Sequence, residues 1–102
     1  MNTKAGSELI SKERQRQRDQ EGWSAEHDAT HSDRSLVTVA ECYISAAVCG
    51  YTNGVPSRWP ESWDPRWWKP STSSIRNLVK AGALLAAEID RLNYIRRLEE
   101  NS

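Results

Sequence analysis

The side chains with the clearest potential for chemistry gather in one short segment that contains both histidines of the chain. His27 and His31 lie there beside Glu26 and Asp28. On a helix, the two histidines would share one face, as the two ligands of the zinc-binding pattern H-E-x-x-H do. Asp28 would then stand where that pattern has its general base. This geometry requires a helix, so the elements on either side decide whether such a site can form.

Those elements leave little room for a helix in the histidine segment. Gly22 is the expected left-handed stop of a first helix, and Asp33 is the expected cap of a second one. Barely one helical turn remains between them, and the chain has no third histidine to complete a metal site. We therefore favour a structural interpretation, in which Trp23 anchors the turn while His27, Asp28 and His31 cap and orient the second helix.

Scattered acidic residues offer an alternative site for magnesium. Mg²⁺ is bound through a few carboxylates together with substrate phosphates, and small all-helical nucleotide pyrophosphohydrolases use acids on antiparallel helices in this way. Those enzymes carry paired E-x-x-[ED] motifs, which this chain lacks. We favour ordinary ion pairs of Glu41 and Glu88 with Arg76, Lys80 or Arg91. The acids that could contribute to a magnesium site are Glu26, Asp28, Glu41, Glu88 and Asp90.

A third group of residues would suit a nucleotide. Trp67 and Trp68 offer indoles that can stack on a base. A serine- and threonine-rich run follows them, and the free N–H groups of a helix N-terminus can receive a phosphate. Lys69, Arg76 and Lys80 add positive charge, and the histidine segment would form the opposite wall. The ordinary alternative is helix capping beside a Trp-rich core with cations stacked on indoles.

The remaining pattern predicts an all-α, three-helix domain with a long ordered loop. We expect helices from Ser7 to about Glu21, over 34–49 and over 75–100, with Gly50 as the stop of the second and a cap within 72–74 for the third. Four prolines between residues 56 and 70 exclude regular structure from the loop at 51–72. Residues 1–6 are expected to be a flexible tail, and the highly charged first helix to be solvated.

Two apolar patterns suggest how the helices pack. In the second helix one apolar stripe is expected to face the core, and it consists of Leu36, Val39, Ala40, Tyr43 and Ala47. Three further apolar residues are expected to widen this buried face, namely Val37, Ile44 and Val48. The third helix is apolar on more than one side, with a stripe of Leu78, Gly82, Leu85, Ile89 and Leu92. Because this is more apolar surface than a small domain needs, we expect self-association into a homo-oligomer.

Length and charge exclude several classes of protein. A chain of 102 residues is expected to form one domain. Fourteen basic and fourteen acidic side chains cancel, so strong nucleic-acid binding is not expected. No apolar run approaches a membrane span, and we expect no signal peptide. Cys42 and Cys49 stand about 10 Å apart along one helix, too far for a disulfide, and are expected to be buried thiols in a reducing cytoplasm.

Three separated motifs carry a resemblance to a known family. They are EGWS-x-EHD-x-x-H at 21–31, WWKP at 67–70 and LVKAGAL-x-x-AEI-x-RL at 78–92. With them the chain resembles a family of short, uncharacterised proteins encoded by phages and prophages. The resemblance implies a phage origin and expression in the cytoplasm of a bacterial host. It supplies no catalytic mechanism, and Ala29 stands where members usually have a second acidic residue.

Three functions are therefore open. We favour a non-enzymatic phage accessory protein that counters host defence by binding a nucleotide-like ligand. The alternatives are an inhibitor that docks on a host protein through the first helix or the Trp-rich loop, and a metal-dependent pyrophosphohydrolase-like enzyme. We assign no catalytic residue, metal or cofactor. The expected ligand-binding residues are Trp23, Glu26, His27, Asp28, His31, Trp67, Trp68, Lys69, Arg76 and Lys80.

Overall fold

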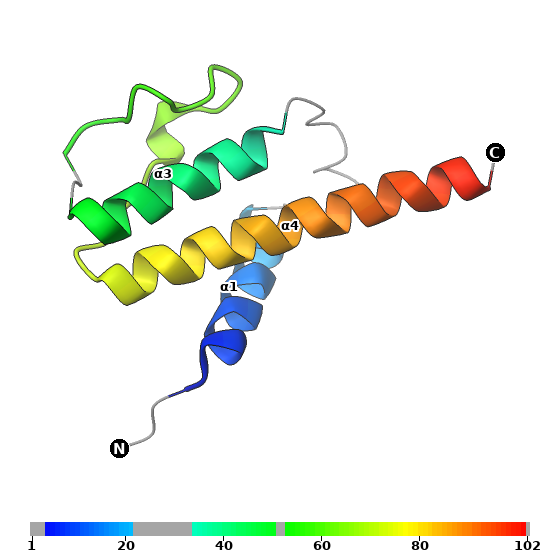
Figure 1. Ribbon diagram of the computed structural model, residues 1–102, viewed down its shortest axis with the longest axis horizontal. Helices are drawn as coiled ribbons and strands as arrows, with labels where there is room; N and C mark the ends of the chain where they lie inside the picture. Colours follow the sequence, from blue (N-terminus) through cyan, green and yellow to red (C-terminus); the bar gives the residue numbers. More distant parts are fainter. Residues whose placement is uncertain (1–3, 22–33, 51–52, 102) are drawn as a thin grey trace.

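The three stretches with helical patterns all form helices in the computed structural model, which describes residues 4–21, 34–50 and 53–101. Helix α1 spans Gly6–Glu21, α3 spans Ser35–Cys49 and α4 spans Ser74–Glu100, with one 3-10 turn, η1, at Pro65–Trp67. The described residues contain no strand, so the all-α prediction is confirmed. Figure 1 shows α3 lying alongside α4, while α1 crosses α4 at a steep angle.

The ends of α3 and α4 are fixed by local chemistry. Gly50 has φ of 68° and its N–H donates to the Ala46 carbonyl, as predicted for a left-handed stop. The Ser73 hydroxyl accepts from the Arg76 N–H at the start of α4. Helix α3 begins after Arg34, which has φ of 62° and gives no side-chain cap. The predicted cap Asp33 lies outside the described residues.

The core lies between α3, α4 and the Trp-rich loop. Trp59 and Trp63 of the loop are buried together with apolar residues of both helices, namely Leu36, Val39, Ala40, Cys42, Tyr43, Ala81, Leu84 and Ala87. Trp63 Nε1 donates to Ser35 Oγ at 2.9 Å, and the two indoles meet edge to face at 6.0 Å. By area each buried indole contributes at most about 4–6 kcal/mol. The loop is therefore part of the core.

The apolar stripes face the core less completely than their patterns predict. Ile44 is exposed and Val48 is 77% exposed, so the expectation that they widen the buried face of α3 is wrong. On α4, the small residues Ala81 and Ala87 belong to the core cluster shared with α3, where their size allows the helices to come close. The stripe residues Leu78, Leu85, Ile89 and Leu92 are exposed instead. No helix in the described part of the chain has the length and apolar character to cross a bilayer.

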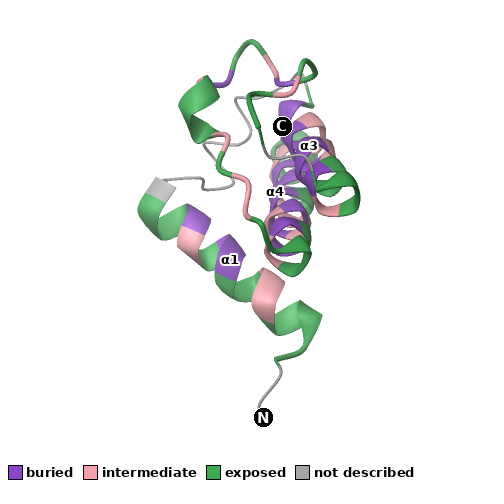
Figure 2. Ribbon diagram, turned by 90° about the vertical axis from the view of Figure 1, so that its left-hand side faces the viewer, coloured by how far each residue is buried: buried purple, intermediate pink, exposed green. Residues whose placement is uncertain are grey.

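Helix α1 is docked rather than solvated, which corrects the expectation from its charge. It begins at Gly6, within the predicted tail, so Ser7 lies in its first turn instead of capping it. Glu13, Arg14 and Gln17 are buried, and Glu13 and Arg14 pair with Arg76 and Asp90 of α4. Figure 2 shows buried segments in purple on α1. Polar contacts with α4, absent from a local sequence pattern, hold this helix.

Close approach of the two helices depends on a glycine. A Cβ added at Gly82 would lie 2.6 Å from Ile10 Cδ1 of α1, well inside van der Waals contact. Gly82 therefore leaves the space that the Ile10 side chain fills.

The two cysteines have different environments. Cys42 is buried in the core, and burial raises the pKa of its thiol above the ordinary value. Cys49, in the last position of α3, is exposed. The prediction of two buried thiols is therefore wrong for Cys49, because the helix face on which it lies turns outward near its C-terminal end.

Candidate functional site

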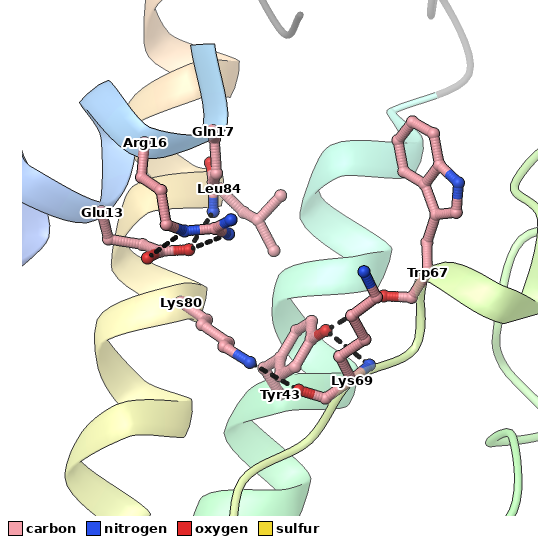
Figure 3. A pocket seen from close by; sticks show the side chains of 8 residues that line it. All are labelled: Glu13, Arg16, Gln17, Tyr43, Trp67, Lys69, Lys80 and Leu84. Atoms are coloured by element: carbon pink, nitrogen blue, oxygen red, sulfur yellow. Dashed lines mark hydrogen bonds and ion pairs between the residues drawn. The ribbon is translucent and has the colours of Figure 1, made fainter. Parts of the chain in front are cut away.

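The end of the Trp-rich loop is held against both long helices by two side chains. The Tyr43 hydroxyl of α3 accepts from the Lys69 N–H at 3.0 Å and donates to the Trp67 carbonyl at 3.3 Å. Lys80 of α4 donates through Nζ to the Lys69 carbonyl at 2.5 Å, and the same Nζ lies 5.6 Å from the centre of the Tyr43 ring. The backbone from Trp67 to Lys69 is thereby fixed in place (Figure 3).

Helix α1 faces this loop end with a network centred on Glu13. Arg16 donates to both carboxylate oxygens of Glu13, at 2.9 and 2.7 Å, and Arg76 of α4 donates to Oε1 at 2.6 Å. Burial alone would raise the pKa of Glu13, but the hydrogen bonds from the two arginines outweigh it and lower this pKa below its ordinary value. Glu13 is therefore ionised at neutral pH and ties α1 to α4.

A pocket lies between the α1 network and the loop end. Its volume is about 290 Å³, including the space open to solvent. The space that water-sized molecules can occupy within it is about 30 Å³, whereas small-molecule pockets usually measure about 300–1,000 Å³, so the pocket is a shallow recess that a nucleotide would enter only in part. The lining residues come from α1, α3, α4 and the loop, and Figure 3 shows the Trp67 indole directed away from the side chains of α1; the lining residues are Glu13, Arg16, Gln17, Tyr43, Trp67, Lys69, Lys80 and Leu84.

The pocket carries an excess of positive charge. Arg16, Lys69 and Lys80 supply three cations against the single carboxylate of Glu13, which Arg76 also neutralises. Within the described part of the chain, no hydrogen bond or ion pair engages the Lys69 ammonium. This group can therefore meet an anion without breaking an existing contact.

Three of the predicted ligand-binding residues line this pocket. They are Trp67, Lys69 and Lys80, and the Trp67 side chain is 39% exposed beside the opening. Arg76 lies behind the wall, where it holds Glu13. The other five predicted residues, Trp23, Glu26, His27, Asp28 and His31, lie outside the described residues.

Trp68 has a different position from its neighbour. It packs against the core, with its ring centre 4.8 Å from that of Tyr43 and 5.6 Å from that of Trp59. It does not line the pocket. Of the two adjacent indoles, only Trp67 is placed to meet a ligand in this pocket.

Sequence reasoning missed the α1 wall of the pocket. Glu13, Arg16 and Gln17 are three and four positions apart, so they share one helix face. That spacing was present in the sequence, but the same spacing occurs on solvated helices. Only the partner Arg76, 63 positions away, distinguishes this face as buried.

The predicted phosphate position at the start of α4 is occupied by capping contacts. The Ser71 N–H donates to Asn77 Oδ1 at 2.8 Å, and Asn77 Nδ2 returns a bond to the Ser71 carbonyl at 2.7 Å. Together with the Ser73 cap, these contacts hold the turn into the helix. The pocket opens further along α4, at Lys80 and Leu84.

The acids considered for magnesium are held by arginines where the structure describes them. Glu88 pairs with Arg91 at 2.6 Å, as predicted. Glu41 pairs with Arg58 of the loop, which was not among its predicted partners. Asp90 pairs with Arg14 of α1 at 3.4 Å. Across residues 4–21, 34–50 and 53–101, no three His, Cys, Asp or Glu side chains gather as a metal site would require.

The arrangement offers recognition of a small anion through a cation, an indole and a tyrosine-anchored loop. These features come from four separate parts of the chain and meet only in the folded protein. In the comparisons with known proteins, no family model, no curated protein and no solved structure matches this chain.

Proposed function

We propose that this protein is a non-enzymatic binding protein for a small nucleotide-like anion held between α1 and the Trp-rich loop. One observation carries the proposal. Lys69, whose ammonium group makes no hydrogen bond or ion pair within the described residues, and the half-exposed Trp67 both line the pocket from one stretch of loop with a fixed backbone. Tyr43 and Lys80 fix the backbone of that stretch, so the points from which both side chains extend are set before a ligand arrives. Such preorganisation lowers the entropic cost of binding.

The chemistry of the lining supports a ligand with an anionic end and a flat aromatic end. A phosphate would meet Lys69, with Arg16 on the facing wall. A base would lie against Trp67, where stacking on an aromatic side chain contributes about 1–3 kcal/mol per base. Leu84 adds an apolar floor.

Titration with nucleoside monophosphates tests this function. The probes are AMP, GMP, CMP and UMP, followed by calorimetry and by quenching of tryptophan fluorescence. Binding of at least one of them, with quenching that a Trp67→Leu variant reduces, would support the pocket. If none of the four binds the intact protein, the proposed function is wrong.

The proposed biological setting is a bacterial cell infected by a phage. The resemblance of three sequence motifs to short phage and prophage proteins is the reason for proposing a phage origin, expression in the host cytoplasm and a role against host defence. Holding a nucleotide-like immune signal would fulfil that role. Expression during a phage challenge tests it: the wild-type protein should restore infection of a defended host, and Lys69→Gln should not.

Self-association through α4 forms part of the same proposal. The exposed residues Leu78, Leu85, Ile89 and Leu92 support it, because they lie on one side of a helix of 27 residues. A second copy could cover them. Light scattering coupled to size exclusion measures the mass in solution, and a monomer at all concentrations would contradict this part.

The docking of α1 favours the ligand-binding proposal over the alternative of an inhibitor. Glu13, Arg14 and Gln17 are engaged inside the protein, and Trp59 and Trp63 are buried. Less of the first helix and of the loop is therefore left for a host protein than the sequence suggested.

A further inference from the structure

An unsatisfied hydrogen-bond acceptor belongs to the α1 wall of the pocket. Gln17 is only 2% exposed and lines the pocket. Its Nε2 donates to Glu13 Oε2 at 3.2 Å, but its Oε1 is buried and has no hydrogen-bond partner. Leaving a buried acceptor unpaired costs about 1–3 kcal/mol, so a donor that reaches this atom gains an unusually favourable contact.

The orientation of the Gln17 amide follows from its neighbour. An ionised carboxylate can only accept hydrogen bonds. Because the pKa of Glu13 is lowered, its carboxylate is charged at neutral pH and requires the amide nitrogen of Gln17 to face it. Exchanging the nitrogen and oxygen would set two acceptors against each other. The unpaired atom of Gln17 is therefore an acceptor.

The second unsatisfied atom of the described chain gives a useful contrast. Trp68 Nε1 is also buried without a partner, but Trp68 packs in the core and does not line the pocket. Among the described residues, only Gln17 combines an unpaired buried side-chain atom with a place in the pocket lining. That coincidence indicates recognition rather than a packing defect.

We infer that Gln17 Oε1 accepts a hydrogen bond from a neutral N–H donor of the ligand, and that the ligand is a nucleotide whose base carries an exocyclic amino group. This inference rests on the proposed function and names the ligand class for the same pocket. Gln17 lines the pocket while its Nε2 stays bonded to Glu13, so Oε1 can accept from a donor that reaches it there. Lys69 takes the anionic end and Gln17 takes the amino group on the facing wall.

This contact selects among ligands. A base without the amino group would leave Gln17 Oε1 buried without a hydrogen bond, whereas the amino group of a matching base would donate a hydrogen bond to it. Sites built to hydrogen-bond a ligand group reject the analogue that lacks it. The expected preference is roughly tenfold or more in Kd.

The test compares AMP with purine riboside 5′-monophosphate, which differs from AMP by the absence of the amino group. Wild-type protein should bind AMP about tenfold more tightly. Gln17→Met keeps an unbranched side chain of similar length without the amide, and it should bind both nucleotides equally, near the weaker affinity. Circular dichroism of the variant checks that its helices are intact.

Each outcome decides the inference. Equal binding of both nucleotides by the wild type overturns it and leaves the proposed function standing. A preference for AMP that survives in Gln17→Met overturns the assignment to Gln17. Absence of binding by either nucleotide removes this inference and counts against the proposed function as well. A wild-type preference that the variant loses supports it.

Discussion

Helix α4 is held by two interfaces of opposite character. On one side Ala81, Leu84 and Ala87 pack in one core cluster with residues of α3 and the buried indoles. On the other side α1 is held by the Glu13–Arg76 pair at 2.6 Å, by Arg14–Asp90 at 3.4 Å and by Ile10 against Gly82. Apolar burial stabilises the first interface, while the second depends on charge and on one close approach.

The pocket lies where the apolar interface of α4 with α3 and the polar interface of α4 with α1 adjoin. Its loop wall belongs to the apolar unit, in which Tyr43 and Lys80 clamp the chain. Its α1 wall belongs to the polar interface, which includes the unpaired Gln17 oxygen. The wall clamped by Tyr43 and Lys80 therefore faces a wall held by ion pairs, and a ligand in contact with both walls would strengthen the docking of α1.

The largest expected effect is loss of the apolar unit in Trp63→Ala. The indole is buried and hydrogen-bonded to Ser35, so its removal should cost about 3–5 kcal/mol of unfolding free energy. Urea unfolding followed by circular dichroism measures the change. Trp67→Ala is the matched control, because its half-exposed indole should cost much less. Equal losses in both variants would contradict the distinction between the two indoles.

A smaller and local effect is expected for Glu13→Gln. The change removes the charge that binds Arg16 and Arg76, and charge-assisted hydrogen bonds contribute about 1.5–3 kcal/mol each. Hydrogen exchange should rise in α1 and stay low in α3. The control is Glu8→Gln at an exposed position of the same helix. Faster exchange across α3 as well would show that the two interfaces are not independent.

Acidification should reproduce this local effect. The pKa of Glu13 is lowered in the folded protein, so its contribution to stability is complete above the ordinary glutamate pKa of about 4.3. That contribution is lost as the pH falls through the lower, folded pKa. Hydrogen exchange in α1 should therefore rise in acid beyond its intrinsic pH dependence, and Glu13→Gln should lack this step. An identical step in the variant would assign it to another group.

The smallest net effect is expected for Gly82→Ala. Alanine favours the helix by up to about 1 kcal/mol, but its Cβ would meet Ile10 Cδ1 at 2.6 Å. The Ile10 side chain must turn away, so the global stability should change little while α1 exchanges faster. Ile10→Ala should relieve the conflict in the double variant, and additive effects of the two changes would contradict the contact.

Much of the apolar unit could be predicted from the sequence because its signals are local. Gly50 stops α3, Ser73 caps α4, and the proline run keeps the loop irregular. The stripe from Leu36 to Tyr43 identified the buried face of α3. Each of these features depends on residues a few positions apart.

The polar interface could not be predicted in the same way. Glu13 and Arg76 are 63 positions apart, and charges that pair in the fold resemble solvated charges in the sequence. The roles of Trp67 and Trp68 likewise differ only through packing, since one faces the pocket and the other the core. Of the candidate site, Lys69, Lys80 and one indole were found, and the wall from α1 was not.

The affinity of Lys69→Gln for nucleoside monophosphates tests the central claim most directly. Calorimetry would compare this variant with Lys12→Gln, which removes the same charge from an exposed position of α1 outside the pocket. We predict a Kd about tenfold or more weaker for Lys69→Gln and an unchanged Kd for Lys12→Gln. Equal affinities of the wild type and both variants would contradict the claim that the pocket beside Lys69 binds the anion.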